Sequence, residues 1–204
     1  MKNKEIITIG IPKGYLFKNS MDFLRKHGIN FTNYSERQLL IKDSSGKYQC
    51  LVLRPSDVPV YVEHGIVDVG ISGLDTIKES NCQLVVLHDL GFGYCRLAIA
   101  QEAGLPLVKF KNGMKVATKF VNCAKKYFKN IGIKADIIKL YGSVELAAIT
   151  GLSDIIIDLV ATGSTIKENN LQETHTIFES TAHLMVNNAF YSLNYPFIRI
   201  LLGK

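Results

Sequence analysis

Short apolar runs rich in β-branched residues alternate with segments of helical spacing along this chain. The runs typical of strands are 5–11, 50–54, 67–72, 83–90, 95–100, 115–118, 135–140 and 154–159. The segments with helical spacing are 14–28, 56–65, 122–132 and 143–151. Alternation of this kind predicts an α/β protein with mostly parallel sheets and flanking helices. With 204 residues, 47% of them hydrophobic, the chain can bury one large core or two small ones.

The middle of the chain leaves the number of domains open. The stretch "HDLGFGYCR" (88–96) places two glycines between two predicted strands. At this point the chain either passes into a second α/β lobe or makes an ordinary glycine turn within one sheet.

Composition narrows the class of protein. No stretch approaches the roughly 18 apolar residues that a membrane span needs, and the first residues run straight into a predicted strand. We therefore expect a cytoplasmic protein with no membrane partner. The four cysteines are dispersed without a Cys-x-x-Cys pair, which favours reduced thiols over a metal site or disulfides.

The net charge of +6 suits a polyanionic partner, either nucleic acid or a phosphorylated small molecule. No nucleic-acid motif with interleaved aromatic residues is present, and "KKYFK" (125–129) is typical of a solvated helix face. We therefore expect a phosphorylated small molecule and no nucleic acid.

One predicted turn is suited to a sugar phosphate. The stretch "DLVATGST" (158–165) follows a buried run, so it lies at the carboxyl edge of a sheet, where ligands bind in open α/β folds. Gly163 permits close approach to the backbone, and a helix beginning here would present free N–H groups. The hydroxyl donors of the turn are Thr162, Ser164 and Thr165. Asp158 would repel a phosphate but can accept hydrogen bonds from sugar hydroxyls beside it. A plain capped turn is the alternative.

Other turns between a strand and a helix offer groups that face anions. Lys13 and Gly14 stand between the first strand and a helix, where the lysine either meets an anion or is merely solvated. Arg54 ends a strand, where it either clamps a diphosphate with two hydrogen bonds or pairs with Asp57. Two further turns of the same kind contain Gly73 and Asp75 in "DVGISGLDTI" (68–77) and Glu145 in "LYGSVELA" (140–147). Ser72 or Asp75 is expected to cap the helix that follows.

Common nucleotide motifs are absent. The sequence has no G-x-x-x-x-G-K-[ST], and "GFGYCR" has Arg96 in place of the third glycine of G-x-G-x-x-G. The five histidines have no convincing Ser or Cys partner by sequence, so the turns favour phosphate binding over a hydrolytic triad.

These stretches together resemble the catalytic subunit of short-form ATP phosphoribosyltransferases, the family that performs the first step of histidine biosynthesis. Residues 145–166 follow the family signature, with Ile166 where Leu or Met is usual. The blocks similar to the family, in the family order, are "IPKG", "RPSDVPVYVEHGIVDVGISGLD", "DLGFGYCRLAIA", "IIKLYGSVELA" and "ESTAHLMVN". The similarity covers nearly the whole chain. Tyr15 stands where the family commonly has Arg, which leaves more of any anion contact to Lys13.

The resemblance implies a two-lobed fold similar to type II periplasmic binding proteins. The first lobe would comprise 1–92 and 182–204, and the second lobe, 93–181, would carry the phosphoribosyl phosphate loop. The implied reaction is transfer of the phosphoribosyl group from phosphoribosyl diphosphate to N1 of ATP, with Mg²⁺ on the diphosphate and triphosphate groups and no metal site made by the chain alone. The residues implied to bind phosphoribosyl diphosphate are Asp158, Ala161, Thr162, Gly163, Ser164 and Thr165. Lys13, Arg54 and Asp158 are implied to be catalytic. The residues implied to bind ATP or to face diphosphate are Lys13, Gly14, Arg54, Gly73, Asp75 and Glu145.

Two rival interpretations remain. Phosphoribosyltransferases of nucleotide salvage usually place two acids in succession before this loop, whereas Leu159 follows Asp158 here. A non-enzymatic solute-binding protein of the same shape would need a signal peptide or anchor, which we do not expect. The resemblance also implies a homodimer within a hetero-oligomer, whose other member is a regulatory subunit that resembles histidyl-tRNA synthetase and binds histidine.

Overall fold

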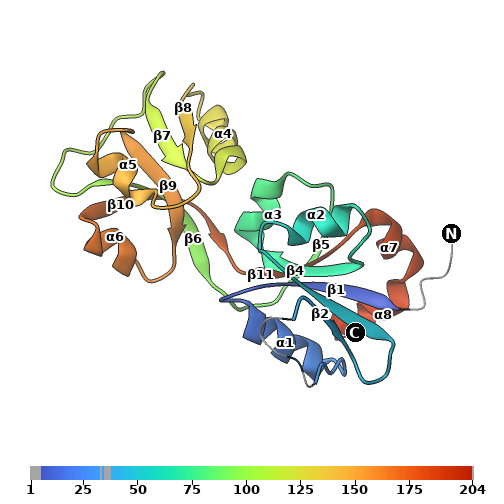
Figure 1. The fold of residues 1–204 in the computed structure, drawn as a ribbon. Helices are drawn as coiled ribbons and strands as arrows, with labels where there is room; N and C mark the ends of the chain where they lie inside the picture. The colour runs from blue at the N-terminus through green and yellow to red at the C-terminus, as the bar shows by residue number, and fades with distance from the viewer. Residues whose placement is uncertain (1–5, 33, 35–37, 204) are drawn as a thin grey trace. The chain divides into compact units, whose positions relative to one another are not determined.

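The chain forms two compact units in a computed structural model that describes residues 6–32, 34 and 38–203 (Figure 1). The first unit comprises Met1–Gly93 and Thr181–Lys204, and the second comprises Tyr94–Ser180. The lobe boundaries expected from sequence, 92/93 and 181/182, each lie one residue away from these divisions.

The first unit contains a sheet with the strand order β2-β3-β1-β4-β11-β5. Its strands are β1 (Ile7–Pro12), β2 (Leu40–Lys42), β3 (Tyr48–Leu53), β4 (Val69–Gly73), β5 (Val85–Asp89) and β11 (Ala182–Val186). Its helices are α1 (Phe17–Lys26), α2 (Val58–Glu63), α3 (Leu74–Ser80), α7 (Asn188–Leu193) and α8 (Tyr195–Leu201).

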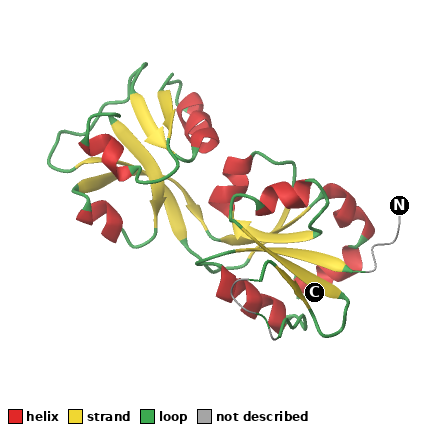
Figure 2. Cartoon of the chain, viewed as in Figure 1, coloured by secondary structure: helices red, strands yellow, loops and turns green. Residues whose placement is uncertain are grey.

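Helices cover both faces of this sheet (Figure 2). Successive side chains of a strand point to opposite faces, so one strand can contribute to a core on each side. Ile9 and Ile11 of β1 belong to a core that includes residues of α1, α7 and α8. A second core joins residues of α2 and α3, including Val58, to Val67. Gly10 faces that second core, where an added Cβ would lie 2.9 Å from a Val67 methyl group.

The second unit contains a sheet with the order β10-β6-β9-β7-β8. Its strands are β6 (Cys95–Glu102), β7 (Lys115–Thr118), β8 (Asp136–Lys139), β9 (Ile155–Val160) and β10 (Leu171–Ser180). Its helices are α4 (Val121–Asn130), α5 (Glu145–Ile149) and α6 (Ser164–Glu168). Helix α4 packs on one face through Phe128, and α5 and α6 pack on the other through Ala147 and Ile166.

The α/β class is confirmed, but the prediction of mostly parallel sheets needs correction. β1 pairs in parallel with β3 and β4, and β7 pairs in parallel with β8 and β9. The antiparallel pairs are β2–β3, β4–β11, β5–β11, β6–β9 and β6–β10. Three of these strands, β2, β10 and β11, were not predicted. β10 shows why, since its sequence "LQETHTIFES" has many half-exposed polar residues, which an antiparallel strand with one wet face tolerates.

No helix in the part of the chain that the structure describes is long and apolar enough to cross a membrane.

Candidate active site

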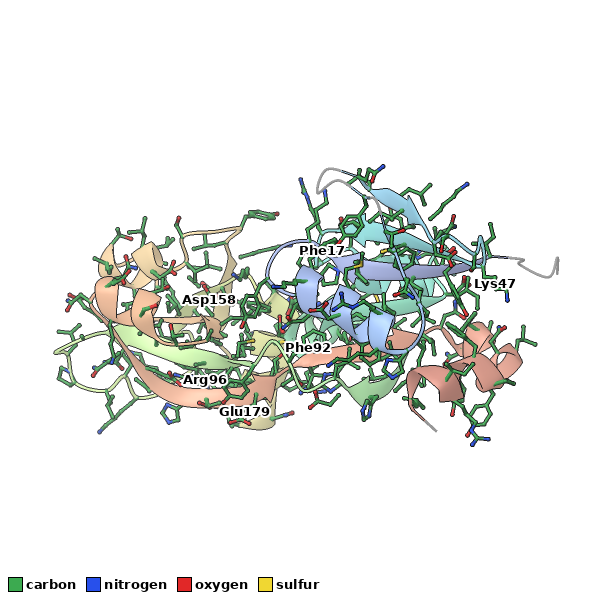
Figure 3. The ribbon with its side chains drawn as sticks, turned by 90° about the horizontal axis from the view of Figure 1, so that it is seen from below. Phe17, Lys47, Phe92, Arg96, Asp158 and Glu179 are labelled. Atoms are coloured by element: carbon green, nitrogen blue, oxygen red, sulfur yellow. The ribbon has the colours of Figure 1, made fainter. Side chains whose placement is uncertain are left out.

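Asp158 (labelled in Figure 3) belongs to β9, an inner strand that lies between β6 and β7 in the second unit's sheet. The neighbouring residues Ile155, Ile156 and Ile157 are at most 1% exposed, as expected for a strand covered on both faces. Asp158 shares its face with Ile156 and therefore lies on the side of α5 and α6. Its side chain is only 12% exposed, so the carboxylate needs partners.

Lys119 supplies one of these partners. Its Nζ atom lies 3.2 Å from Oδ1 of Asp158, and the same Oδ1 accepts a hydrogen bond from the backbone N–H of Leu159 at 2.8 Å. Lys119 comes directly after β7, whose last residue, Thr118, is in register with Ile157. The sequence analysis missed Lys119. A signal for it exists in "KVATKF", where a lysine follows a buried strand directly.

The loop after β9 exposes its hydroxyl groups. Gly163 has φ +82°, the left-handed region that favours glycine, and it immediately precedes α6. The Oγ atoms of Thr162 and Ser164 lie 3.0 Å apart, and the N–H of Ser164 donates to Thr162 Oγ1 at 3.4 Å. Ala161, Thr162, Ser164 and Thr165 are all exposed. A ligand phosphate can therefore reach several donors on one short turn.

An ion pair lies beside the beginning of this loop. Arg96 of β6 donates from Nε and Nη2 to the two carboxylate oxygens of Glu173 on β10, at 2.8 and 2.6 Å. Its Nη1 atom is 3.4 Å from the carbonyl oxygen of Ala161. Hydrogen bonding to Arg96, helped by Thr176, holds the pKa of the Glu173 carboxyl below its usual range. The same contact raises the pKa of Arg96, so the pair stays charged across the neutral range.

Two cations lie at the carboxyl edge of the first unit's sheet. Pro12 of β1 is in register with Leu53 of β3, and the N–H of Lys13 donates to the Leu53 carbonyl at 2.8 Å. The residues that follow these strands, Lys13 and Arg54, are therefore neighbours along the edge, and both are exposed. Within the described residues no ion pair joins Arg54 to Asp57. Helix α1 begins only at Phe17, so Lys13 precedes its first turn.

The other candidates have different surroundings. Gly73 is the N-cap of α3 and has no side chain to cap it, so the expectation that Ser72 or Asp75 occupies the N-cap position is wrong. Asp75 is 6% exposed, and an added Cβ on Gly73 would lie 2.4 Å from its Oδ1. Glu145 is the first residue of α5 and is half-buried. Tyr15, by contrast, is 79% exposed.

The candidates fall into two groups that belong to different units. Asp158, Glu145 and the loop 161–165 lie in the second unit, and Lys13, Gly14, Arg54, Gly73 and Asp75 lie in the first. Exposed cations, hydroxyl groups and glycine turns at sheet edges suit a phosphorylated small molecule.

The fold places the chain in the class of two-unit α/β proteins similar to type II periplasmic binding proteins. A solved substrate binding protein of an amino acid ABC transporter matches it with a TM-score of 0.60 over 97% of this chain and 90% of that one. The two sequences are 13% identical, so this likeness concerns the fold alone.

Sequence comparison shows the particular family. The family described as HisG, ATP phosphoribosyltransferase, matches residues 54–203. The ATP phosphoribosyltransferase of Rippkaea orientalis is 46% identical over 93% of this chain and 92% of that protein, and that of Trichormus variabilis is 43% identical over 93% and 89%. The solved ATP phosphoribosyl transferase (HisG:HisZ) complex from Thermotoga maritima contains a chain with a TM-score of 0.83 and 34% identity, covering 97% of this chain and 98% of that one. The chain belongs to the ATP phosphoribosyltransferase family.

Proposed function

We propose that this chain transfers the 5-phosphoribosyl group of phosphoribosyl diphosphate to N1 of ATP and releases diphosphate, the first step of histidine biosynthesis. The structural observation that carries the proposal is the second unit's combination of a mostly buried acid with a hydroxyl-rich loop. Asp158 and the loop 161–165, exposed except for the half-buried Gly163, lie within eight consecutive positions at the end of one strand. Family membership over nearly the whole chain supports the choice of reaction.

Within this proposal, the second unit holds the sugar phosphate. The 5-phosphate accepts hydrogen bonds from the hydroxyls and N–H groups of 162–165, and Asp158 accepts hydrogen bonds from ribose hydroxyls. Lys119 holds the Asp158 carboxylate in position for the sugar, because its Nζ atom lies 3.2 Å from Oδ1.

The carboxyl edge of the first unit's sheet carries two exposed cations of its own. Lys13 and Arg54 would face diphosphate or triphosphate oxygens, and the two-pronged guanidinium of Arg54 suits two of them at once. The transition state is oxocarbenium-like, and negative charge develops on the leaving diphosphate. N1 of adenine carries no proton, so the chain's contribution is positioning and charge stabilisation without a general base.

Magnesium fits this site only if substrate phosphates supply most of its ligands. Among the described residues, no group of three or more His, Cys, Asp or Glu side chains could hold a metal ion. Mg²⁺ accepts one or two carboxylates together with phosphate oxygens and water, and Glu145, half-buried at the start of α5, is available as a carboxylate. Bound on the phosphates, the ion would take up part of the negative charge on diphosphate.

The first rival is a phosphoribosyltransferase of nucleotide salvage, which usually has a second acid next to the first. Here that position is Leu159, whose side chain packs against the α4 core on the opposite face of β9. A second acid at this position would face apolar side chains instead of a sugar. The second rival is a solute-binding protein, which shares the fold but would leave both substrates unchanged.

One assay separates these possibilities. The purified chain is incubated with ATP, free nucleobases, phosphoribosyl diphosphate and Mg²⁺, alone and with the proposed regulatory subunit, and the products are identified by mass spectrometry. We expect a phosphoribosyl adduct of ATP and one diphosphate per turnover. An adduct on a free nucleobase, or no adduct under either condition, would overturn the proposal.

We also propose that the chain forms a homodimer inside a hetero-oligomer with a synthetase-like regulatory subunit. The support is that the similar Thermotoga maritima chain was solved as a HisG:HisZ complex. Because both substrates are cytoplasmic metabolites, we place the reaction in the cytoplasm.

A further inference from the structure

The Arg96–Glu173 ion pair differs from an ordinary surface pair in exposure and geometry. The Arg96 and Glu173 side chains are 25% and 23% exposed, whereas those of the pair Arg25–Asp22 on α1 are 70% and 40% exposed. Both carboxylate oxygens of Glu173 are used, at 2.8 and 2.6 Å, in the parallel two-bond arrangement that only arginine makes. Such a pair holds its side chains in one geometry, which exposed single-bond pairs rarely do.

The strands around this pair are arranged so that one guanidinium reaches the candidate phosphate loop. β6 lies between β10 and β9, and Arg96 is in register with Val160, the last residue of β9. The Nη1 atom of Arg96, which Glu173 does not use, is directed at the carbonyl of Ala161 at 3.4 Å. Ala161 is the first residue of the loop, so its peptide orientation influences where the next N–H groups point.

The partner strand also restrains the carboxylate. Thr176 donates from Oγ1 to Glu173 Oε1 at 3.1 Å, so that oxygen accepts two hydrogen bonds. The register of β10 with β6 is irregular at two places after Glu173, between Glu173 and His175 and between Thr176 and Phe178. Irregularities of this kind redirect side chains, and here Glu173 meets Arg96 although Ala100 is its register partner.

We propose that Arg96 and Glu173 act together as positioning residues that fix the loop 161–165 in its phosphate-binding conformation. This inference rests on the proposed function for its kinetic consequence, but the effect on the loop does not depend on it. Neither residue contacts the reacting atoms in this proposal. Their role is to hold the Ala161 carbonyl so that the donors of Thr162, Gly163 and Ser164 are already arranged when the 5-phosphate arrives.

The first test measures the loop directly and needs no substrate. Arg96→Lys keeps the charge but loses the two-bond geometry and the contact with Ala161. Amide hydrogen exchange in a peptide covering 161–165 should become about 5- to 30-fold faster, because the loop loses its hydrogen bond from the guanidinium to the Ala161 carbonyl. Glu173→Gln should produce a smaller change in the same direction. Unchanged exchange in both variants would overturn the proposal.

The second test measures kinetics with a matched control. In Arg96→Lys, KM for phosphoribosyl diphosphate should rise about 5- to 20-fold while KM for ATP and kcat change less than twofold, because only the phosphate subsite is disturbed. Glu173→Gln should raise the same KM less strongly, and Glu179→Gln is its matched control, since Glu179 lies on β10 with Glu173, is in register with Arg96 and binds Tyr94 instead. It removes the same charge and should leave both constants and the exchange rate unchanged.

The outcomes separate this proposal from the proposed function. If the wild-type chain makes no phosphoribosyl adduct, the proposed function fails, and hydrogen exchange still decides the role of the pair. If the adduct forms and Arg96→Lys lowers kcat and both affinities equally, the pair supports the whole unit instead of the loop, and the positioning role is wrong. Should Arg96→Lys not fold, Glu173→Gln provides both readouts.

Discussion

The ammonium group of Lys119 lies 3.2 Å from Oδ1 of Asp158, across two neighbouring parallel strands of the second unit. The lysine side chain is 43% exposed and the aspartate side chain 12% exposed. The acid is thus held by a cation that is itself accessible to solvent and to anions. A sugar that uses Asp158 would meet a carboxylate already oriented by this contact.

Asp158→Asn should keep the fold and weaken the use of phosphoribosyl diphosphate. An amide retains the shape but loses a charged acceptor for ribose hydroxyls, which should cost about 1.5–3 kcal/mol. The value of kcat/KM for this substrate should fall about 10- to 150-fold, measured by steady-state kinetics at saturating ATP. An unchanged kcat/KM would show that Asp158 does not bind the sugar.

Lys119→Met serves as the control for that variant, because it breaks the same ion pair from the other side while keeping an apolar stem. Both variants should lower the melting temperature, since each leaves a charged group without its partner. Lys119→Met should lower kcat/KM for phosphoribosyl diphosphate less than Asp158→Asn does. Equal losses in kcat/KM would mean that the ion pair, and not the ribose contact, accounts for the effect.

The sequence predicts strands best where apolar residues are continuous. β9, with "III" buried on both faces, and β7, with "KVAT", were placed within a residue of their observed bounds. β10 was missed because an antiparallel strand tolerates polar residues on one face. β11 is short and mostly buried, and its pairing partner β4 is distant in sequence.

The candidate site likewise contains residues that could be predicted from a local sequence pattern and residues that could not. The loop 161–165 could be predicted because its glycine and hydroxyl residues are contiguous, so a local pattern carries the signal. Lys119 could not be assigned to Asp158 without the strand order β6-β9-β7. Arg96 likewise meets Glu173 only through β10, which was not predicted. Contacts between strands depend on topology, and a single sequence specifies that only indirectly.

Gly163→Val should abolish binding of the 5-phosphate. At φ +82° a branched side chain is strained whatever the space around it, and the strained turn would move the N–H groups of the loop. Titration calorimetry with ribose 5-phosphate or phosphoribosyl diphosphate should detect no binding. Gly113→Val is the matched control, because Gly113 has φ +77° and open space nearby but precedes β7. It should lose comparable stability while it still binds the sugar phosphate.

Thr165→Ala should have a milder effect. Thr165 is exposed in the first turn of α6, and its carbonyl accepts a hydrogen bond from the Asn169 side chain that the substitution leaves intact. Loss of one neutral hydroxyl donor should cost about 0.5–1.5 kcal/mol, or about 2- to 12-fold in affinity for the sugar phosphate. The same calorimetric titration measures it. A loss as complete as that of Gly163→Val would mean that the hydroxyl, and not the backbone, holds the phosphate.

Acid should remove a stabilising contribution of the Arg96–Glu173 pair. The folded-state pKa of Glu173 is below its ordinary value because Arg96 hydrogen-bonds the charged form. The contribution is therefore complete above the unfolded-state pKa, about 4.3, and is lost as the pH falls through the lower folded-state value. Urea unfolding between pH 7 and pH 3 should show a steeper loss of stability for the wild type than for Glu173→Gln. Parallel curves for the two proteins would contradict this assignment.

The last prediction concerns assembly and regulation. Multi-angle light scattering should find the purified chain as a homodimer, and we expect it to have little activity and no inhibition by histidine. Adding the synthetase-like regulatory subunit should give a larger hetero-oligomer that is more active and is inhibited by histidine, because the effector site belongs to that subunit. The coupling is reciprocal at equilibrium, so substrates should in turn weaken histidine binding by the complex. A paired assay with and without the partner, at several histidine concentrations, measures both effects. Full activity with histidine inhibition from the isolated chain would refute the division of labour, since the effector site would then belong to the catalytic chain.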